Sequence, residues 1–450
     1  MARIASDPED CAAITRRGWA QRAIPARNSA WRRALRNMDL CFRVDMSCQF
    51  VLHVFLVNPI PLHHQMKAIS RRNYLKRMVL TAAAGSVSAY SIPRAVFAGE
   101  EETQHLPTET EEAAMAGIAQ KLLEQHKAPG LSVAIARHGQ MVYQRGFGQA
   151  DKAIGERVSP ASLFRIASVS KPITSVPIFS LIEQGRLGLH DLIFGPQGIL
   201  KYDYGNDYPG LINKITLHHL LTHTCGGWGN DGSDPMFYKP ELNHHELITW
   251  TLHHQPLKFE PGTHYAYSNF GYCLLGRVIE KISGQPYAEF VQQAVLAKCG
   301  ITDMRLGGNT FAQRASGEVV YYGQKGSGTN PYDMNITRMD SHGGWIATPS
   351  DLVRFAIHVD GFKTTPNILR SDTLKMMTTA TTANSHYACG WCVNGIPNWW
   401  HTGSLPGTLT ILVRTGSGLC WAAFTNTRAE GLDLDAMMWQ MVKAVPAWKA

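Results

Sequence analysis

The eight residues FRIASVSK, at positions 164–171, decide how this sequence is interpreted. They contain Ser168 and, three residues later, Lys171. On a helix this spacing places two side chains on the same face, one turn apart. A serine hydroxyl is a weak nucleophile until a neighbouring base takes its proton. We therefore predict that Ser168 is a nucleophile and that Lys171 handles its proton; the alternative for Lys171 is an ordinary solvated lysine.

Two motifs further along the chain strengthen this interpretation: YSN at 267–269 and HTG at 401–403. A phenol with a free pKa near 10 is a poor base at neutral pH unless a cation stands beside it. Tyr267 and Lys171 therefore make chemical sense as a pair, whereas the alternative for Tyr267 is a buried core residue. A lone Ser-x-x-Lys arises by chance about once or twice in a chain of this length. The prediction depends on the three motifs occurring together.

The composition is that of a well-packed globular protein. The 450 residues are 44% hydrophobic and 17% charged, which excludes a disordered or fibrous chain. A formal charge of +8 would suit nucleic-acid binding. However, residues 1–98 hold 15 of the 43 Lys and Arg residues and only 5 of the 35 Asp and Glu residues, so residues 99–450 carry a charge of −2. We expect no nucleic-acid partner.

The basic N-terminal region resembles an export signal of the twin-arginine type. SRRNYLK at 70–76 precedes a weakly apolar run at 78–92 and then VFA at 96–98, which is a small-x-small cleavage site. We expect residues 66–98 to be this signal and the product to be exported, to the periplasm or beyond; the alternative is a basic amphipathic helix. Residues 1–65 are an uncertain leader, either untranslated or disordered. Without a run of 18 apolar residues, no stable membrane span is predicted.

Six of the nine cysteines follow the predicted signal. They are Cys225, Cys273, Cys299, Cys389, Cys392 and Cys420. A chain of this size needs no disulfides for stability, so we expect free buried thiols. Cys389 and Cys392 have the spacing of a redox motif, but they occupy a strand-like run without a second cysteine pair, and neither a redox nor a zinc role is favoured.

Hydrophobic periodicity predicts strands at both ends of residues 99–450 and helices between them. Strands are expected at 130–137, 141–146, 388–393, 399–403, 408–414 and 420–424. Helices are expected at 107–127, 168–187, 216–222, 241–254, 271–283, 287–299, 348–359 and 432–445. This order indicates an α/β (α+β) class: one antiparallel sheet flanked by helices, with an inserted all-helical lobe. We place the sheet lobe at about 107–165 and 340–450 and the helical lobe at about 166–335. The loop 226–240 is expected to form the rim of a substrate cleft.

Together these motifs resemble the penicillin-recognising Ser-x-x-Lys enzymes, specifically the class C β-lactamase and D-alanyl-D-alanine carboxypeptidase-like branch with its related esterases. The resemblance covers about residues 110–445. Its motifs, in family order, are FRIASVSK, LLTHT at 220–224, PG at 261–262 just before YSN, GG at 343–344, and HTG. The resemblance implies a β-lactamase/transpeptidase-like fold and an acyl-enzyme on Ser168.

The resemblance also implies roles for individual residues. Tyr267 would assist proton transfer to the leaving group, and Asn269 would bond the substrate amide and Lys171. The backbone N–H of Ser404 would complete an oxyanion hole with that of Ser168.

HTG, by its own chemistry, is expected on a strand edge where an extended substrate could add as a further strand. This motif comprises His401, Thr402 and Gly403, and the glycine would permit a close backbone approach. In the β-lactamases a lysine usually stands where this chain has His401, which weighs against a β-lactamase.

The sequence therefore predicts an exported serine hydrolase that acts on small amide or ester substrates, of D-alanyl carboxypeptidase or esterase type. Its substrates would be small molecules or short peptides, including β-lactams or cell-wall peptides. The alternatives are a true β-lactamase and a catalytically silent penicillin-binding or regulatory module. The chemistry needs no cofactor.

Histidine clusters do not predict a metal site. In His244-His245-Glu246, the second ligand histidine of a zinc protease would fall at Thr249. His218, His219 and His223 lack matching carboxylates, so helix capping or core packing is the preferred interpretation.

Overall fold

The computed structural model describes residues 105–232, 234–323 and 330–448. The predicted leader and the predicted export signal lie outside these residues. Among the described helices, none combines the length and hydropathy that crossing a bilayer requires.

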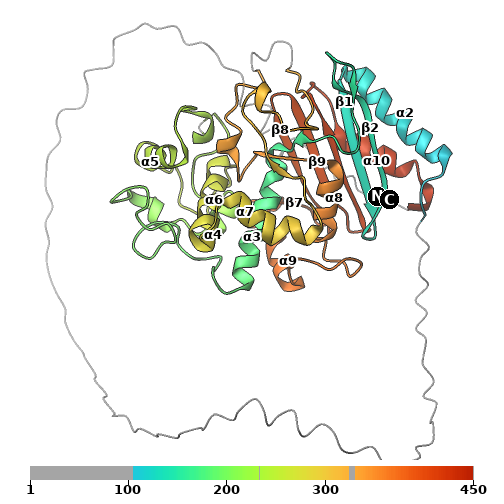
Figure 1. The fold of residues 1–450 in the computed structure, drawn as a ribbon. Coiled ribbons are helices and arrows are strands. Elements are labelled where there is room, and N and C mark those ends of the chain that lie inside the picture. Colours follow the sequence, from blue (N-terminus) through green and yellow to red (C-terminus); the bar gives the residue numbers. More distant parts are fainter. Residues whose placement is uncertain (1–104, 233, 324–329, 449–450) are drawn as a thin grey trace, which may run out of the picture. The chain divides into compact units, whose positions relative to one another are not determined.

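Both ends of the described chain contribute to one antiparallel sheet (Figure 1). Within the described residues it has seven strands in the order β3-β2-β1-β10-β9-β8-β7. They are β1 (Gly130–Arg137), β2 (Gln140–Asp151), β3 (Glu156–Arg157), β7 (Cys392–Val393), β8 (Trp399–Leu405), β9 (Thr408–Arg414) and β10 (Leu419–Thr425). The pairing of β1 with β10 confirms the predicted sheet built from both ends of the domain.

Helices cover both faces of this sheet. The helices α2 (Glu109–His126) and α10 (Leu434–Lys443) lie together beside one face, and α8 (Pro349–Ile357) packs against the other. Successive side chains of β1 point to opposite faces of the sheet, which produces two cores. Leu131 and Val133 pack with the side chains of α2 and α10, whereas Ala134 belongs to the core on the other face. The helix α8 begins near the predicted position, with a capping box and with Pro349 in its first turn.

The chain between β4 (Phe164–Arg165) and β6 (Trp345–Ala347) holds most of the inserted helices, as predicted, but the two-residue strand β5 (Arg305–Leu306) also lies in it, so this part is not all-helical. Its helices are α3 (Ser170–Glu183), α4 (Leu217–Leu221), α5 (His244–His254), α6 (Asn269–Ser283) and α7 (Tyr287–Val291), the last continued by a π-helical turn at Gln292–Leu296. A small sheet that the sequence did not predict joins β4 (Phe164–Arg165), β6 (Trp345–Ala347) and β5 (Arg305–Leu306). The short helix α9 (Ser371–Met377) was not predicted either.

Most predicted elements differ from the observed ones by a few residues at their ends, and two of the differences lie close to the site. The strand expected at 388–393 is wrong for most of its length: only Cys392–Val393 is a strand, because Gly390 has a φ of 84° and the N–H of Ala388 bonds the carbonyl of Trp391 in a turn. The helix expected from residue 168 begins at Ser170. All six cysteines within the described residues are free and buried, as predicted.

Candidate active site

Ser168 lies in a 3₁₀ turn, Ala167–Val169, between β4 and α3. Its side chain is partly exposed, and the turn leads into the N-terminal end of α3, where the helix dipole favours negative charge. Ala167 has a φ of 48°, which a residue with a Cβ rarely adopts. Such strain persists only where the surroundings hold it. Here the Thr410 hydroxyl donates to the carbonyl of Ile166 at 2.8 Å.

Gly403 also helps to determine where the serine turn lies. A Cβ on Gly403 would lie 2.2 Å from the carbonyl oxygen of Ile166 and 2.3 Å from the Thr410 hydroxyl. The glycine was predicted to allow a close backbone approach, and the backbone that approaches it is the protein's own. The strand β8 therefore runs directly beside the serine turn.

The edge of β8 is open where the sequence predicted it. Residues 401–405 pair with β9 on one side, whereas β7 pairs only with Trp399 and Trp400. Thr402 and Ser404 are half-buried. Within the described residues no other strand is paired with this edge, so the addition of an extended substrate remains compatible with the fold.

Lys171 is fully buried and lies within hydrogen-bond distance of three groups. Its Nζ is 3.1 Å from Ser168 Oγ, 2.8 Å from Asn269 Oδ1 and 3.1 Å from the carbonyl oxygen of His342. Burial lowers the pKa of Lys171 well below its ordinary value, although the charge of Asp234 acts in the opposite direction.

The hydrogen-bond partners of Lys171 suit a neutral amine, which has two hydrogens and one lone pair. The amide oxygen of Asn269 and the carbonyl of His342 can only accept, so they take both hydrogens. The lone pair then faces the hydroxyl of Ser168. The geometry allows the lysine to receive the serine proton.

Asp234 is a buried site residue that the sequence interpretation missed. Its Oδ2 accepts hydrogen bonds from the backbone N–H of Asn269 at 2.8 Å and from Asn269 Nδ2 at 3.1 Å. Its Oδ1 accepts one from the backbone N–H of Met236 at 3.0 Å. Burial raises the pKa of Asp234 to about 6. Because a carboxylate only accepts, it fixes the amide of Asn269 with its oxygen toward Lys171.

One signal for Asp234 was present in the sequence. Asp-Pro is a common start for a short helix, and Asp234 caps the 3₁₀ turn Pro235–Phe237. That signal accounts only for the hydrogen bond that Asp234 Oδ1 accepts from the backbone N–H of Met236. The bonds to Asn269 join residues 35 positions apart.

Tyr267 lies beside the amine of Lys171. The Nζ is 4.6 Å from the centroid of the Tyr267 ring, and the side chain is partly exposed. The buried ring of His223 lies behind it, with 4.2 Å between the two ring centroids. His223 Nδ1 accepts from the backbone N–H of Ser268 at 3.1 Å, so this histidine packs in the core and supports the YSN turn. Burial lowers the pKa of His223 well below its ordinary value.

His401 is held by two hydrogen bonds. Its Nδ1 lies 2.6 Å from the carbonyl of Thr402 and must donate to it; its Nε2 lies 3.1 Å from the hydroxyl of Tyr387. The residue is only 3% exposed, and burial lowers the pKa of His401 to about 3. The neutral ring therefore accepts from Tyr387 at Nε2. The sequence interpretation did not identify Tyr387.

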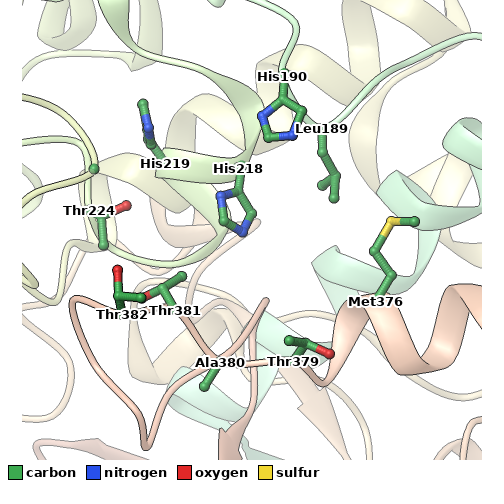
Figure 2. A pocket seen from close by; sticks show the side chains of 11 residues that line it. Leu189, His190, His218, His219, Thr224, Met376, Thr379, Ala380, Thr381 and Thr382 are labelled. Carbon is green, nitrogen blue, oxygen red and sulfur yellow. The ribbon is translucent and has the colours of Figure 1, made fainter.

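His218 and His219 face a pocket whose lining includes none of Ser168, Lys171 and Tyr267. They line a pocket of about 490 Å³ with His190 and with Thr379–Thr382 on the opposite wall (Figure 2). The rings of His190 and His218 meet edge to face with 6.0 Å between their centroids. Across the described ranges, no group of three or more His, Cys, Asp or Glu side chains is arranged to hold a metal ion.

Comparisons with known proteins give one consistent answer. The family model described as Beta-lactamase matches residues 115–444. Penicillin-binding protein 4* of Bacillus subtilis is 28% identical over 326 residues, which cover 66% of this chain and 67% of that protein. Esterase EstB of Burkholderia gladioli is 29% identical over 241 residues, which cover 50% of this chain and 55% of that protein. The chain thus spans about two thirds and about half of these relatives.

Solved structures show the same fold. D-amino acid amidase from Ochrobactrum anthropi SV3, complexed with L-phenylalanine amide, superimposes with a TM-score of 0.61 at 22% identity, covering 75% of this chain and 98% of that one. The β-lactamase/D-alanine carboxypeptidase from Pseudomonas syringae gives a TM-score of 0.61 at 19% identity, with coverages of 74% and 99%. The predicted β-lactamase/transpeptidase-like fold is confirmed.

Proposed function

Because the chain belongs to the β-lactamase family of serine hydrolases, we propose that it forms an acyl-enzyme on Ser168 and hydrolyses small amide or ester substrates. The proposal rests on the hydrogen-bond partners of Lys171. Two obligate acceptors take its hydrogens and leave its lone pair facing Ser168.

The first half of the reaction forms the acyl-enzyme. Ser168 Oγ attacks the substrate carbonyl carbon as its proton passes to Lys171 Nζ. The backbone N–H groups of Ser168 and Ser404 stabilise the negative oxygen of the tetrahedral intermediate. The bond from the carbonyl carbon to the leaving oxygen or nitrogen then breaks. The leaving group takes the proton, with Tyr267 assisting the transfer from Lys171.

The second half releases the product. Water attacks the acyl carbon, its proton passes to the amine of Lys171, and the bond to Ser168 Oγ breaks. Ser168 recovers its proton and the carboxylic acid leaves. Asn269 holds the amine of Lys171 in place throughout and bonds the substrate amide where there is one.

The test is acylation by p-nitrophenyl acetate, followed by intact-protein mass and p-nitrophenol release. Wild type should gain one acetyl group and turn over, and Ser168→Ala should gain none and lose about 10³-fold or more in turnover. Ser170→Ala is the matched control, because Ser170 is buried two residues away and its hydroxyl has no hydrogen-bond partner among the described residues. Full activity in Ser168→Ala would falsify the proposal.

Export by the twin-arginine route is a separate proposal, supported by residues 70–98 of the sequence alone. Replacing Arg71 and Arg72 together with lysine should retain the protein in the cytoplasm of a bacterium that has this pathway. Fractionation of cells that express the wild type and the variant measures the result. Equal export of both would exclude the route.

A further inference from the structure

We propose that Tyr387 is a positioning residue that holds the oxyanion-binding strand in place through His401. The hydroxyl of Tyr387 fixes the ring of His401, and the ring fixes the carbonyl of Thr402. Two peptide units then lead to the N–H of Ser404. The inference rests on the proposed acyl-enzyme chemistry, in which that N–H stabilises the negative oxygen of the tetrahedral intermediate.

Both nitrogens of the buried His401 ring need their partners. The carbonyl of Thr402, 2.6 Å from Nδ1, can only accept, so the ring hydrogen lies on Nδ1. Nε2 then presents a lone pair, which accepts from the hydroxyl of Tyr387 at 3.1 Å. A ring that is fixed at both nitrogens has one orientation, and Tyr387 provides one of the two contacts.

Tyr387 is itself firmly held. It pairs with Cys392 in an antiparallel bridge and is only 1% exposed. Its ring packs against that of His223, with 4.7 Å between the two centroids. Burial raises the pKa of Tyr387 well above its ordinary value, so the hydroxyl keeps its hydrogen at neutral pH. Tyr387 is therefore a fixed donor for the Nε2 of His401.

The sheet does not supply this support. The strand β7 pairs only with Trp399 and Trp400 of β8. Within residues 105–232, 234–323 and 330–448, no strand pairs with residues 401–405 on that side. The bond from His401 Nδ1 to the carbonyl of Thr402 is therefore a contact that no ladder hydrogen bond replaces.

The position of Thr402 affects the proposed oxyanion hole through the backbone. Its carbonyl and the nitrogen of Gly403 belong to one planar peptide unit, and the next unit carries the N–H of Ser404. Gly403 also lies against the carbonyl of Ile166 in the serine turn. The segment is thus held between that turn and His401, and loosening either contact displaces the N–H of Ser404.

Removing the hydroxyl of Tyr387 leaves the lone pair of His401 Nε2 buried without a donor, which is unfavourable. The ring reaches water only by turning out of its buried position, and turning breaks its bond to Thr402. The N–H of Ser404 is then held less precisely. Because this N–H binds the oxyanion more strongly than the ground-state carbonyl, the loss affects kcat rather than KM.

The test is Tyr387→Phe, with p-nitrophenyl acetate as the substrate. kcat should fall about 10-fold, whereas KM should change less than about twofold. In wild type the Nδ1 hydrogen of His401 should give a slowly exchanging proton NMR signal at low field, assigned by its loss in His401→Gln. Tyr387→Phe should lose this signal as well.

Tyr208→Phe is the matched control. It removes another buried phenol hydroxyl, which accepts from the backbone N–H of Tyr204 at 3.2 Å in the chain between α3 and α4. This variant should keep the wild-type kcat and the signal of His401.

The wild-type spectrum tests the inference even if Tyr387→Phe does not fold, because absence of the His401 signal contradicts it. An unchanged kcat in folded Tyr387→Phe, or a lower kcat with the signal intact, also overturns the inference and leaves the acyl-enzyme proposal standing. Failure of wild-type Ser168 to gain an acetyl group overturns both.

Discussion

Replacing Asp234 with asparagine tests whether the base Lys171 depends on a carboxylate that it does not touch. The carboxylate accepts three hydrogen bonds, two from Asn269 and one from Met236. An asparagine has one accepting oxygen and one donating nitrogen. Whichever way its amide turns, its NH₂ group faces at least one N–H that formerly had an acceptor.

The geometry gives a magnitude for the change. Leaving one buried N–H without its acceptor costs about 1–3 kcal/mol, so Asp234→Asn should lower the free energy of unfolding by about 1–3 kcal/mol. Either a neutral amide oxygen or an NH₂ group then replaces the carboxylate oxygen that binds Asn269, so the amide of Asn269 is oriented less firmly and its oxygen holds a hydrogen of Lys171 less well. Weakening that bond should lower kcat/KM about 10-fold.

The pH profile distinguishes positioning of the base from general damage. The negative charge of Asp234 raises the pKa of Lys171, so removing it lowers that pKa further. Activity falls when the amine of Lys171 becomes protonated, and the acid limb of kcat/KM should therefore move to lower pH in Asp234→Asn.

The assay measures kcat/KM for a p-nitrophenyl ester from pH 4 to 9, together with urea unfolding. Asp231→Asn is the matched control, because this carboxylate is exposed and lies in the same loop. A variant with reduced stability but an unmoved acid limb and normal kcat/KM would show that Asp234 has only a structural role.

Three further predictions concern other parts of the site and the core. His401 resists protonation until about pH 3 when folded but takes a proton near 6.5 when unfolded. Its contribution to stability is therefore complete above pH 6.5, and about 3 kcal/mol of it is lost by pH 4. Urea unfolding at pH 7 and 4 should show that His401→Gln loses about 3 kcal/mol less than wild type over this range. Gly403→Ala should lower the free energy of unfolding by about 3 kcal/mol or more, because the new Cβ would meet the backbone of Ile166. Gly395→Ala should change it little, because among the described residues no atom lies within 4 Å of the position of its Cβ; thermal melts compare the two variants. Iodoacetamide at pH 8 should leave the six buried cysteines unmodified until the protein unfolds, as site-resolved mass spectrometry can show.

Features that depend on local pattern could be predicted from the sequence. The capping box of α8 and the alternation in β1 and β9 each depend on residues within one element. The Ser-x-x-Lys spacing likewise placed Ser168 and Lys171 within hydrogen-bond distance, although through a 3₁₀ turn rather than a regular helix start. The same local rule was wrong at residues 388–393, where Gly390 turns the chain.

Features that depend on contacts between distant segments could not be predicted. Asp234 acts on Asn269, and Tyr387 acts on His401 from a segment whose predicted strand is a turn. Neither pair has a recognisable spacing, because the partners lie on different elements joined by loops of no fixed length. Polar residues in loops are common, so their type alone does not distinguish a site residue from a solvated one.

Gly403 shows how a correct residue can be predicted with an incomplete reason. A glycine on a binding strand was expected to let another backbone approach, and the carbonyl of Ile166 occupies that space. This contact, with the bond from Thr410 on β9, holds the serine turn against β8. The strand that is expected to bind substrate therefore also fixes the nucleophile. Changes in β8 or β9 should affect acylation and substrate binding together, whereas changes at Asp234 should act on the site through Asn269.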